Sequence, residues 1–475
     1  MTNTLSLIVR HEMRRLWRSR ALLPLLLAFA ALCAYAAWSG MQWTAQRNGA
    51  LADIRAEESK TQQLRRKQIA EKVTPENRSF YGGALFSTAM SLRATLPPGE
   101  LAVLTVGQAE GYPMAASVFP FAASNTLFDD HVAGLENPSI LAAGRIDLAF
   151  VLVYLFPLLL LAGSFDLWSA ERESGAAPWL LSQPVPAARY LLAKAAARWF
   201  ALALPMLAAL LMVLWWAGAR DAGGLALTLA IGAAYGLFWL GLAALVNVYA
   251  RSGAQAALGC LAGWLAVVVL APALALVAVD VAAPPSNPGE RVNALRAQAM
   301  QARAESRAAA RTAAVPNTAA AAAGKPNIPD SLRRRAVEVE RGEHLIRQVS
   351  ARFRAQDERR QHWMDAMRFA SPAIAVQDAL ERVAGADAAR ARLFQDQAHA
   401  FLLGVRVLVQ RDLDADRLLT VADYDRGLPQ FAFREPALAG RLAALGLDLA
   451  AIAVFLAALL WCGARRLRKQ SHFFE

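Results

Sequence analysis

The residues of this chain that could perform chemistry do not form a recognisable catalytic or metal site. A GxxxxGK[ST] phosphate-binding loop is absent, because Gly324-Lys325 is followed by Pro326. The six histidines are scattered without the spacing of metal ligands. The three cysteines, Cys33, Cys260 and Cys462, lie in apolar segments without CxxC spacing, which disfavours zinc and disulfide bonds. We therefore expect no enzyme activity, no metal and no cofactor in this chain.

One acidic residue lies inside a long apolar run. Asp448 is one to two helical turns into the last such run, and Arg441 precedes it. An ionisable group at this depth marks a polar pathway or an ion pair, so we expect Asp448 to face a pathway or to pair with Arg441. An intramembrane protease would need paired aspartates, a serine and histidine couple or a zinc motif at this depth, and the apolar runs contain almost none of these groups.

A second group of candidate residues lies in the segment 166–198, between two apolar runs. Acidic residues at Glu171 and Glu173, with Arg172 between them, suit a helix start, and Gly175 permits a sharp change of direction. An apolar cluster ending in proline follows, with Trp179, Leu180, Leu181, Gln183 and Pro184. Such a piece can lie on the membrane surface and insert into a groove of a soluble partner. Alternatively, it rests in the lipid headgroups as an amphipathic connector.

Six long apolar runs must position these residues. Of 475 residues, 56% are hydrophobic and only 19% are charged, and the apolar residues are concentrated in blocks. Each block can cross a hydrocarbon core about 30 Å thick. The predicted membrane spans are 21–38, 148–165, 199–217, 225–249, 255–279 and 443–463. Pro157, Pro205 and Pro272 fall inside spans and predict kinks, at which neighbouring groups must replace the lost backbone hydrogen bond.

The first apolar run also admits a different interpretation. Ala34-Tyr35-Ala36 offers the small residues of a signal-peptide cleavage site after an arginine-rich start. However, the basic region is too long for a signal peptide, and Trp38 and Trp43 are typical of interfacial anchors. A membrane span is therefore the favoured interpretation.

The basic residues predict the orientation. The net charge of +12 falls largely beside apolar runs, so the positive-inside rule and anionic headgroups explain it without nucleic acid. Arginines are abundant in residues 1–20 and in the tail 464–475, which predicts that both termini and the segment 166–198 are cytoplasmic. The long segments 39–147 and 280–442 are then extracytoplasmic.

These two long segments are predicted to form one divided extracytoplasmic domain. Residues 43–72 and 331–369 are rich in Arg, Glu, Gln and Ala and contain no proline, which favours long helices. The predicted fold class is an all-α polytopic membrane protein with six transmembrane helices and a mainly helical, split extracytoplasmic domain.

The acidic segment also resembles a known family. Glu171-Arg172-Glu173-x-Gly175, followed by Leu180-Leu181-Ser182-Gln183-Pro184, resembles the coupling-helix signature of ABC type-2 transporter permeases. Further similarity lies at Val106-Gly107-Gln108, Tyr112-Pro113, Glu136-Asn137-Pro138, Gly144-Arg145 and Ser371-Pro372-Ala373 with Gln377-Asp378. These residues are similar to a bacterial branch with large ectodomains between spans one and two and between spans five and six. The sequence departs from the family at Ala176-Ala177-Pro178, where a proline would shorten the coupling helix.

The resemblance implies a function. Members of that family pair two six-span permeases in the bacterial inner membrane, and two cytoplasmic ATPases, which bind ATP and Mg, dock on the coupling segments. Residues 1–20 then correspond to the interfacial elbow helix, and export is the commoner role. The competing interpretation is a non-transporting scaffold or sensor whose ectodomain binds a periplasmic or outer-membrane partner. The substrate is left open.

Overall fold

The computed structural model describes residues 2–20, 22–74, 77, 91–128, 146–176, 179, 182, 187–312, 328–436 and 438–471. Among these residues, five helices are long and apolar enough to cross a membrane. They are α2 (Leu22–Lys72), α9 with η5 and α10 (Ala187–Arg198, Trp199–Ala203, Leu204–Trp216), α11 (Ala222–Tyr249), α12 with η6 and α13 (Gly253–Trp264, Leu265–Leu270, Ala271–Ala282), and α19 (Leu438–Ser471). Helices make up most of the described chain, as expected for a polytopic all-α membrane protein.

The predicted span 148–165 corresponds to a shorter apolar helix. It consists of α5 (Leu148–Phe150), the π-helical turn η4 (Val151–Leu155) and α6 (Phe156–Ala162). At 1.5 Å per residue, the run Leu148–Ala162 is only about 22 Å long. Asp147 caps its start by accepting a hydrogen bond from the Phe150 N–H. It ends at Gly163, whose N–H bonds back to Leu159.

The three prolines predicted to kink spans each follow a π-helical turn closely. Pro157 follows η4, Pro205 follows η5 and Pro272 follows η6. Because proline has no N–H, carbonyl groups one turn earlier lose their helical partner. Side chains of neighbouring helices bond to carbonyls in these turns: Tyr235 Oη donates to Val153 O (3.0 Å), and Ser371 Oγ donates to Val267 O (2.6 Å). Packing thus satisfies both carbonyls.

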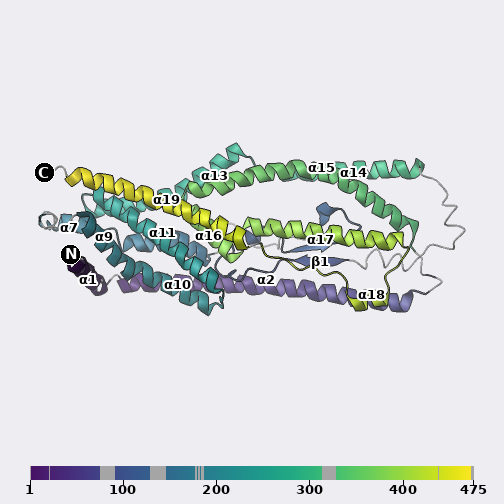
Figure 1. Ribbon diagram of the computed structural model, residues 1–475, viewed down its shortest axis with the longest axis horizontal. Coiled ribbons are helices and arrows are strands. Elements are labelled where there is room, and N and C mark those ends of the chain that lie inside the picture. Colours follow the sequence, from purple (N-terminus) through teal and green to yellow (C-terminus); the bar gives the residue numbers. More distant parts are fainter. Residues whose placement is uncertain are drawn as a thin grey trace.

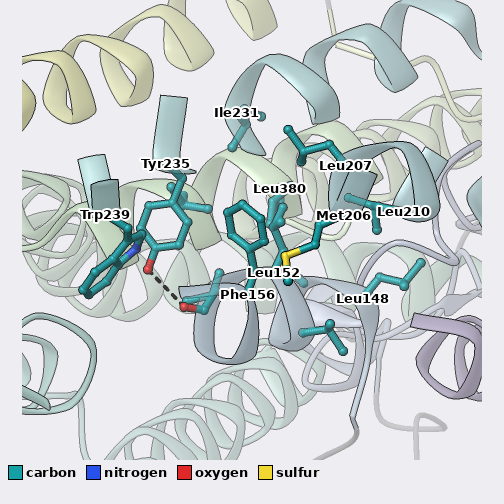
Figure 2. Close-up of a cluster of buried hydrophobic side chains, with 14 of the residues drawn as sticks. Leu148, Leu152, Phe156, Met206, Leu207, Leu210, Ile231, Tyr235, Trp239 and Leu380 are labelled. Carbon is teal, nitrogen blue, oxygen red and sulfur yellow. Dashed lines mark hydrogen bonds between the residues drawn. The ribbon is translucent and has the colours of Figure 1, made fainter. Parts of the chain in front are cut away.

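The helices share one apolar core. Leu152 and Phe156 pack against Met206 of α10 and against Ile231 and Tyr235 of α11, as Figure 2 shows. By contrast, the end of η6 and α13 expose Leu270, Leu274, Val277 and Val281, which recur at helical spacing along one face. An exposed apolar stripe of this length is typical of a helix that faces lipid or another membrane subunit.

The end of the molecule away from the termini has its own hydrophobic core, and we call it the distal domain. It contains the second half of α2, strands β1 (Leu92–Thr95) and β2 (Ala115–Val118), the helices α14 (Pro288–Thr312), α15 (Asp330–Ala366), α17 (Ala388–Asp414) and α18 (Val421–Arg426), and the 3-10 turn η3 (Ser124–Thr126). The strands are antiparallel, with Leu92 opposite Val118. Ile69, Leu92 and Val118 pack with Phe394 and Leu402, so segments far apart in the sequence share this core.

A short helix joins the two parts. After the 3-10 turn η7 (Met367–Phe369), α16 (Pro372–Ala384) packs against α11 and α19 at the distal side of the bundle, and its Val376 and Leu380 lie in the bundle core. A further 3-10 turn, η2 (Gly107–Glu110), lies against α16, where Gln108 Nε2 donates a hydrogen bond to Glu381.

Both termini lie at the same end of an elongated molecule (Figure 1). Helix α1 (Thr2–Arg18) packs along α9 at that end, which we call the base, and the short helix α7 (Ser169–Glu173) lies there too. Helix α2 runs from the base to the far end of the distal domain, about 76 Å for 51 residues.

Candidate functional site

The predicted coupling segment contains α7 at the base. Four of its predicted contact residues, Leu180, Leu181, Gln183 and Pro184, lie outside the described residues, as do Ala177 and Pro178. Glu171, Arg172, Glu173, Gly175 and Trp179 are described. The first three each contact another part of the chain.

A buried asparagine on α11 holds the start of α7. Asn247 is fully buried, and its Oδ1 accepts hydrogen bonds from the N–H groups of Trp168 (3.0 Å) and Ser169 (3.1 Å). Its Nδ2 donates to the carbonyls of Phe165 and Ala243, both at 2.8 Å. The first N–H groups of a helix have no partner inside it, so Asn247 supplies in trans what a capping residue normally supplies.

Two charged residues of α7 bind the connection between α11 and α12. The Arg172 guanidinium donates to the carbonyls of Ala250 and Val248. Glu173 Oε1 accepts a hydrogen bond of 2.7 Å from the N–H of Gly253, the first residue of α12. A carboxylate at that position also interacts favourably with the positive end of the α12 dipole. Helix α7 is therefore fixed to two of the candidate spans.

Glu171 points into the protein and is buried. Its Oε1 lies 2.5 Å from Nζ of Lys194 on α9 and 3.9 Å from Arg15 of α1. The hydroxyl of Tyr190 also approaches it at 3.5 Å. Glu171 is thus an internal ion-pair partner and is not a residue of the exposed surface.

Gly175 and Trp179, two described residues after α7, form what we call the tip of the segment. Gly175 adopts a positive φ of 72°, which favours glycine, and no atom of the described residues beyond its chain neighbours lies within 4 Å of the position that a Cβ would occupy. Trp179 is 69% exposed. A large aromatic side chain this exposed at the base is suited to contact with a partner or with headgroups.

The second predicted site, at Asp448, has different partners from the one expected. Asp448 is fully buried, and its carboxylate binds Arg368 of η7 (2.8 Å) and Arg382 of α16. Arg441 was the predicted partner, but it lies seven residues earlier, about 10.5 Å along the same helix axis. The observed partners are 80 and 66 residues away in the sequence, so only the fold brings them to Asp448.

An acidic residue that the sequence analysis did not single out lies next to this ion pair. Glu381 of α16 is buried and accepts hydrogen bonds from Gln377 Nε2 (2.8 Å) and from Gln108 Nε2 of η2 (3.2 Å). Burial, together with the nearby carboxylates of Asp378 and Asp147, raises the pKa of Glu381 to about 7. The sequence alone gave no signal for this site, because Gln108 and Glu381 are 273 residues apart.

No described residues form a cluster able to hold a metal ion. A cavity of about 20 Å³ lies between α2, the loop 96–109 and the start of α17, with Arg47, Tyr112 and Arg390 in its wall. This volume accommodates about one water molecule. Within the described chain, the contacts at α7 and at Asp448 hold helices together.

Part of the chain matches a known protein-family model. Residues 331–434, which contain α15, η7, α16, α17 and α18, match a family model described as "Domain of unknown function (DUF3526)". No curated protein matches the chain. The match covers less than a quarter of the sequence, and it includes Arg368, Arg382 and Glu381 but not α7.

Proposed function

We propose that this chain is the membrane subunit of an ATP-driven ABC transporter, a type-2 permease on which a separate cytoplasmic ATPase docks. The observation that carries the proposal is the construction of the coupling segment. Its tip exposes Trp179, while the helix behind the tip is bonded to α9, α11 and α12. A partner that moved the tip would therefore move the bundle.

The proposal assigns a side of the membrane to each part. The base, with both termini and the tip, is cytoplasmic, and the distal domain is the split extracytoplasmic domain. The helix Leu148–Ala162 then serves as the sixth span beside the five long ones. The membrane is the bacterial inner membrane, a second permease subunit completes the pathway, ATP and Mg are held by the ATPase, and export is the direction proposed.

The decisive experiment is co-purification of the full chain with the ATPase encoded beside it. We expect Trp179→Ala to reduce the retained ATPase severalfold, because the variant removes the largest exposed apolar group of the tip. Trp216→Ala is the matched control, since Trp216 is similarly exposed but lies at the last residue of α10, at the end of that span away from the base. The proposal fails if wild-type protein retains no ATPase, or if both variants retain it equally.

A non-transporting scaffold or sensor is the second candidate, and one observation favours it. The distal domain has a separate core, and the family match lies mainly within it. Such a protein would bind a periplasmic or outer-membrane partner through this domain. It would show that interaction without any ATP-dependent flux in vesicles, whereas a permease requires both ATP and the docked ATPase.

A further inference from the structure

Six charged side chains from four segments meet at the base and form what we call the base network. They are Glu12 and Arg15 of α1, Asp166 in the connection before α7, Glu171 of α7, and Lys194 and Arg198 of α9. Four of them have side chains no more than 10% exposed, and Lys194 is completely enclosed. Lys194 and Arg198 are four residues apart, so both project from one face of α9.

Each cation bridges two carboxylates. Lys194 Nζ lies 2.5 Å from Glu171 and 3.8 Å from Glu12. Arg198 Nη2 lies 3.0 Å from both Glu12 and Asp166, and its Nη1 donates to the Gly163 carbonyl at 2.5 Å. Glu12 thus joins α1 to both cations of α9, Lys194 and Arg198. Glu171 joins α7 to the same network.

A helix that merely rests in lipid headgroups does not account for this arrangement. Such a helix turns its apolar side chains toward the acyl chains and its charged side chains toward water. In α1, however, the carboxylate of Glu12 and the side chain of Leu16 are buried against the protein, while Leu7 and Trp17 are exposed. One face of α1 is therefore available to lipid, and the other face packs against α9.

We propose that Glu12 is a positioning residue that makes α1, α7 and the base of the α9–α10 span move as one body. This inference rests on the proposed function. It adds a second route by which a movement of the ATPase is transmitted from α7 to the membrane spans. The first route runs from α7 to α11 and α12 through Asn247 and Glu173. The second runs from Glu171 through Lys194 to Glu12, and so into the helix that continues through η5 into α10.

The test uses the full chain with its ATPase in lipid nanodiscs and compares wild type with Glu12→Gln. The docking tip is untouched, so ATPase retention and the KM for ATP should stay within about twofold of wild type. The kcat of ATP turnover should change about threefold or more, toward the value of the isolated ATPase, because movement is no longer passed into α1 and α9. Glu57→Gln on the exposed part of α2 is the matched control and should change neither constant.

The charge-conserving variant separates positioning from simple folding. Glu12→Asp keeps the carboxylate but shortens it by one methylene, so its kcat should lie between those of wild type and Glu12→Gln. If Glu12→Gln does not assemble, Glu12→Asp alone decides the matter. A wild-type kcat in the assembled variant would overturn the role of Glu12. A wild-type chain that retains no ATPase would instead reject the proposed function, and with it this role.

Discussion

The carboxylate of Asp448 is enclosed between two guanidinium groups, and its removal would deprive both Arg368 and Arg382 of their buried counter-charge, leaving Arg368 with Asp365 at 3.7 Å. Breaking a buried ion pair on one side costs about 3–5 kcal/mol, because the remaining charge stays desolvated. We therefore expect Asp448→Asn to lower the melting temperature of the purified protein strongly. The matched control is Asp357→Asn, since Asp357 pairs with Arg291 at 3.5 Å on the exposed surface, where a pair contributes up to about 1 kcal/mol. Equal losses in both variants would contradict the buried ion pair.

Glu381 predicts a pH dependence of stability. Burial raises its pKa to about 7 from a usual value of 4.5, so between these values the folded state binds a proton that the unfolded state has released. Stability should therefore fall as the pH rises from about 4.5 to about 7, by up to about 3 kcal/mol, and should then level off. Glu381→Gln should flatten the plot of melting temperature against pH over this window, whereas Glu57→Gln should leave the wild-type slope. A wild-type slope in Glu381→Gln would refute the assignment.

At the scale of elements, Asn247 predicts how firmly α7 is held. Asn247→Ala removes the acceptor for the N–H groups of Trp168 and Ser169, and a buried donor without a partner costs about 1–3 kcal/mol. We expect hydrogen exchange at these two amides to accelerate about tenfold or more, measured by mass spectrometry of peptides from 160–175. Asn293→Ala, at an exposed position of α14, should leave the exchange unchanged. Unchanged exchange in Asn247→Ala would show that other contacts hold α7.

The elements differ in how far the sequence predicts them. The five long helices were predictable because each contains an uninterrupted apolar run, although α9 begins at Ala187, twelve residues before the predicted span. The strands β1 and β2 were not predicted, because four residues each are too short to show alternation. The acidic start of α7 was visible, but its partners Asn247 and Lys194 were not, since a single polar residue in an apolar run does not reveal which helix it faces.

The whole molecule is organised along one axis. Helix α2 begins near the base and ends beside α18, where Arg66 and Asp425 form an exposed ion pair at 2.8 Å. The distal core contains residues from both long segments, and α16 in the bundle core is followed along the chain by α17, which lies in the distal core. Two continuous elements therefore lead from the bundle to the distal domain, namely α2 and the pair α16 and α17.

The proposed orientation makes a prediction at this scale. In a Cys462→Ser background, Ser471→Cys places a thiol at the end of α19 and Arg426→Cys places one on α18, at the opposite end of the molecule. The two remaining cysteines, Cys33 and Cys260, are buried. In intact spheroplasts, a membrane-impermeant thiol reagent should label the Arg426→Cys variant alone, and after permeabilisation it should label both. Labelling of the Ser471→Cys variant alone would invert the orientation, and the tip at Trp179 would then lie where no cytoplasmic ATPase can reach it.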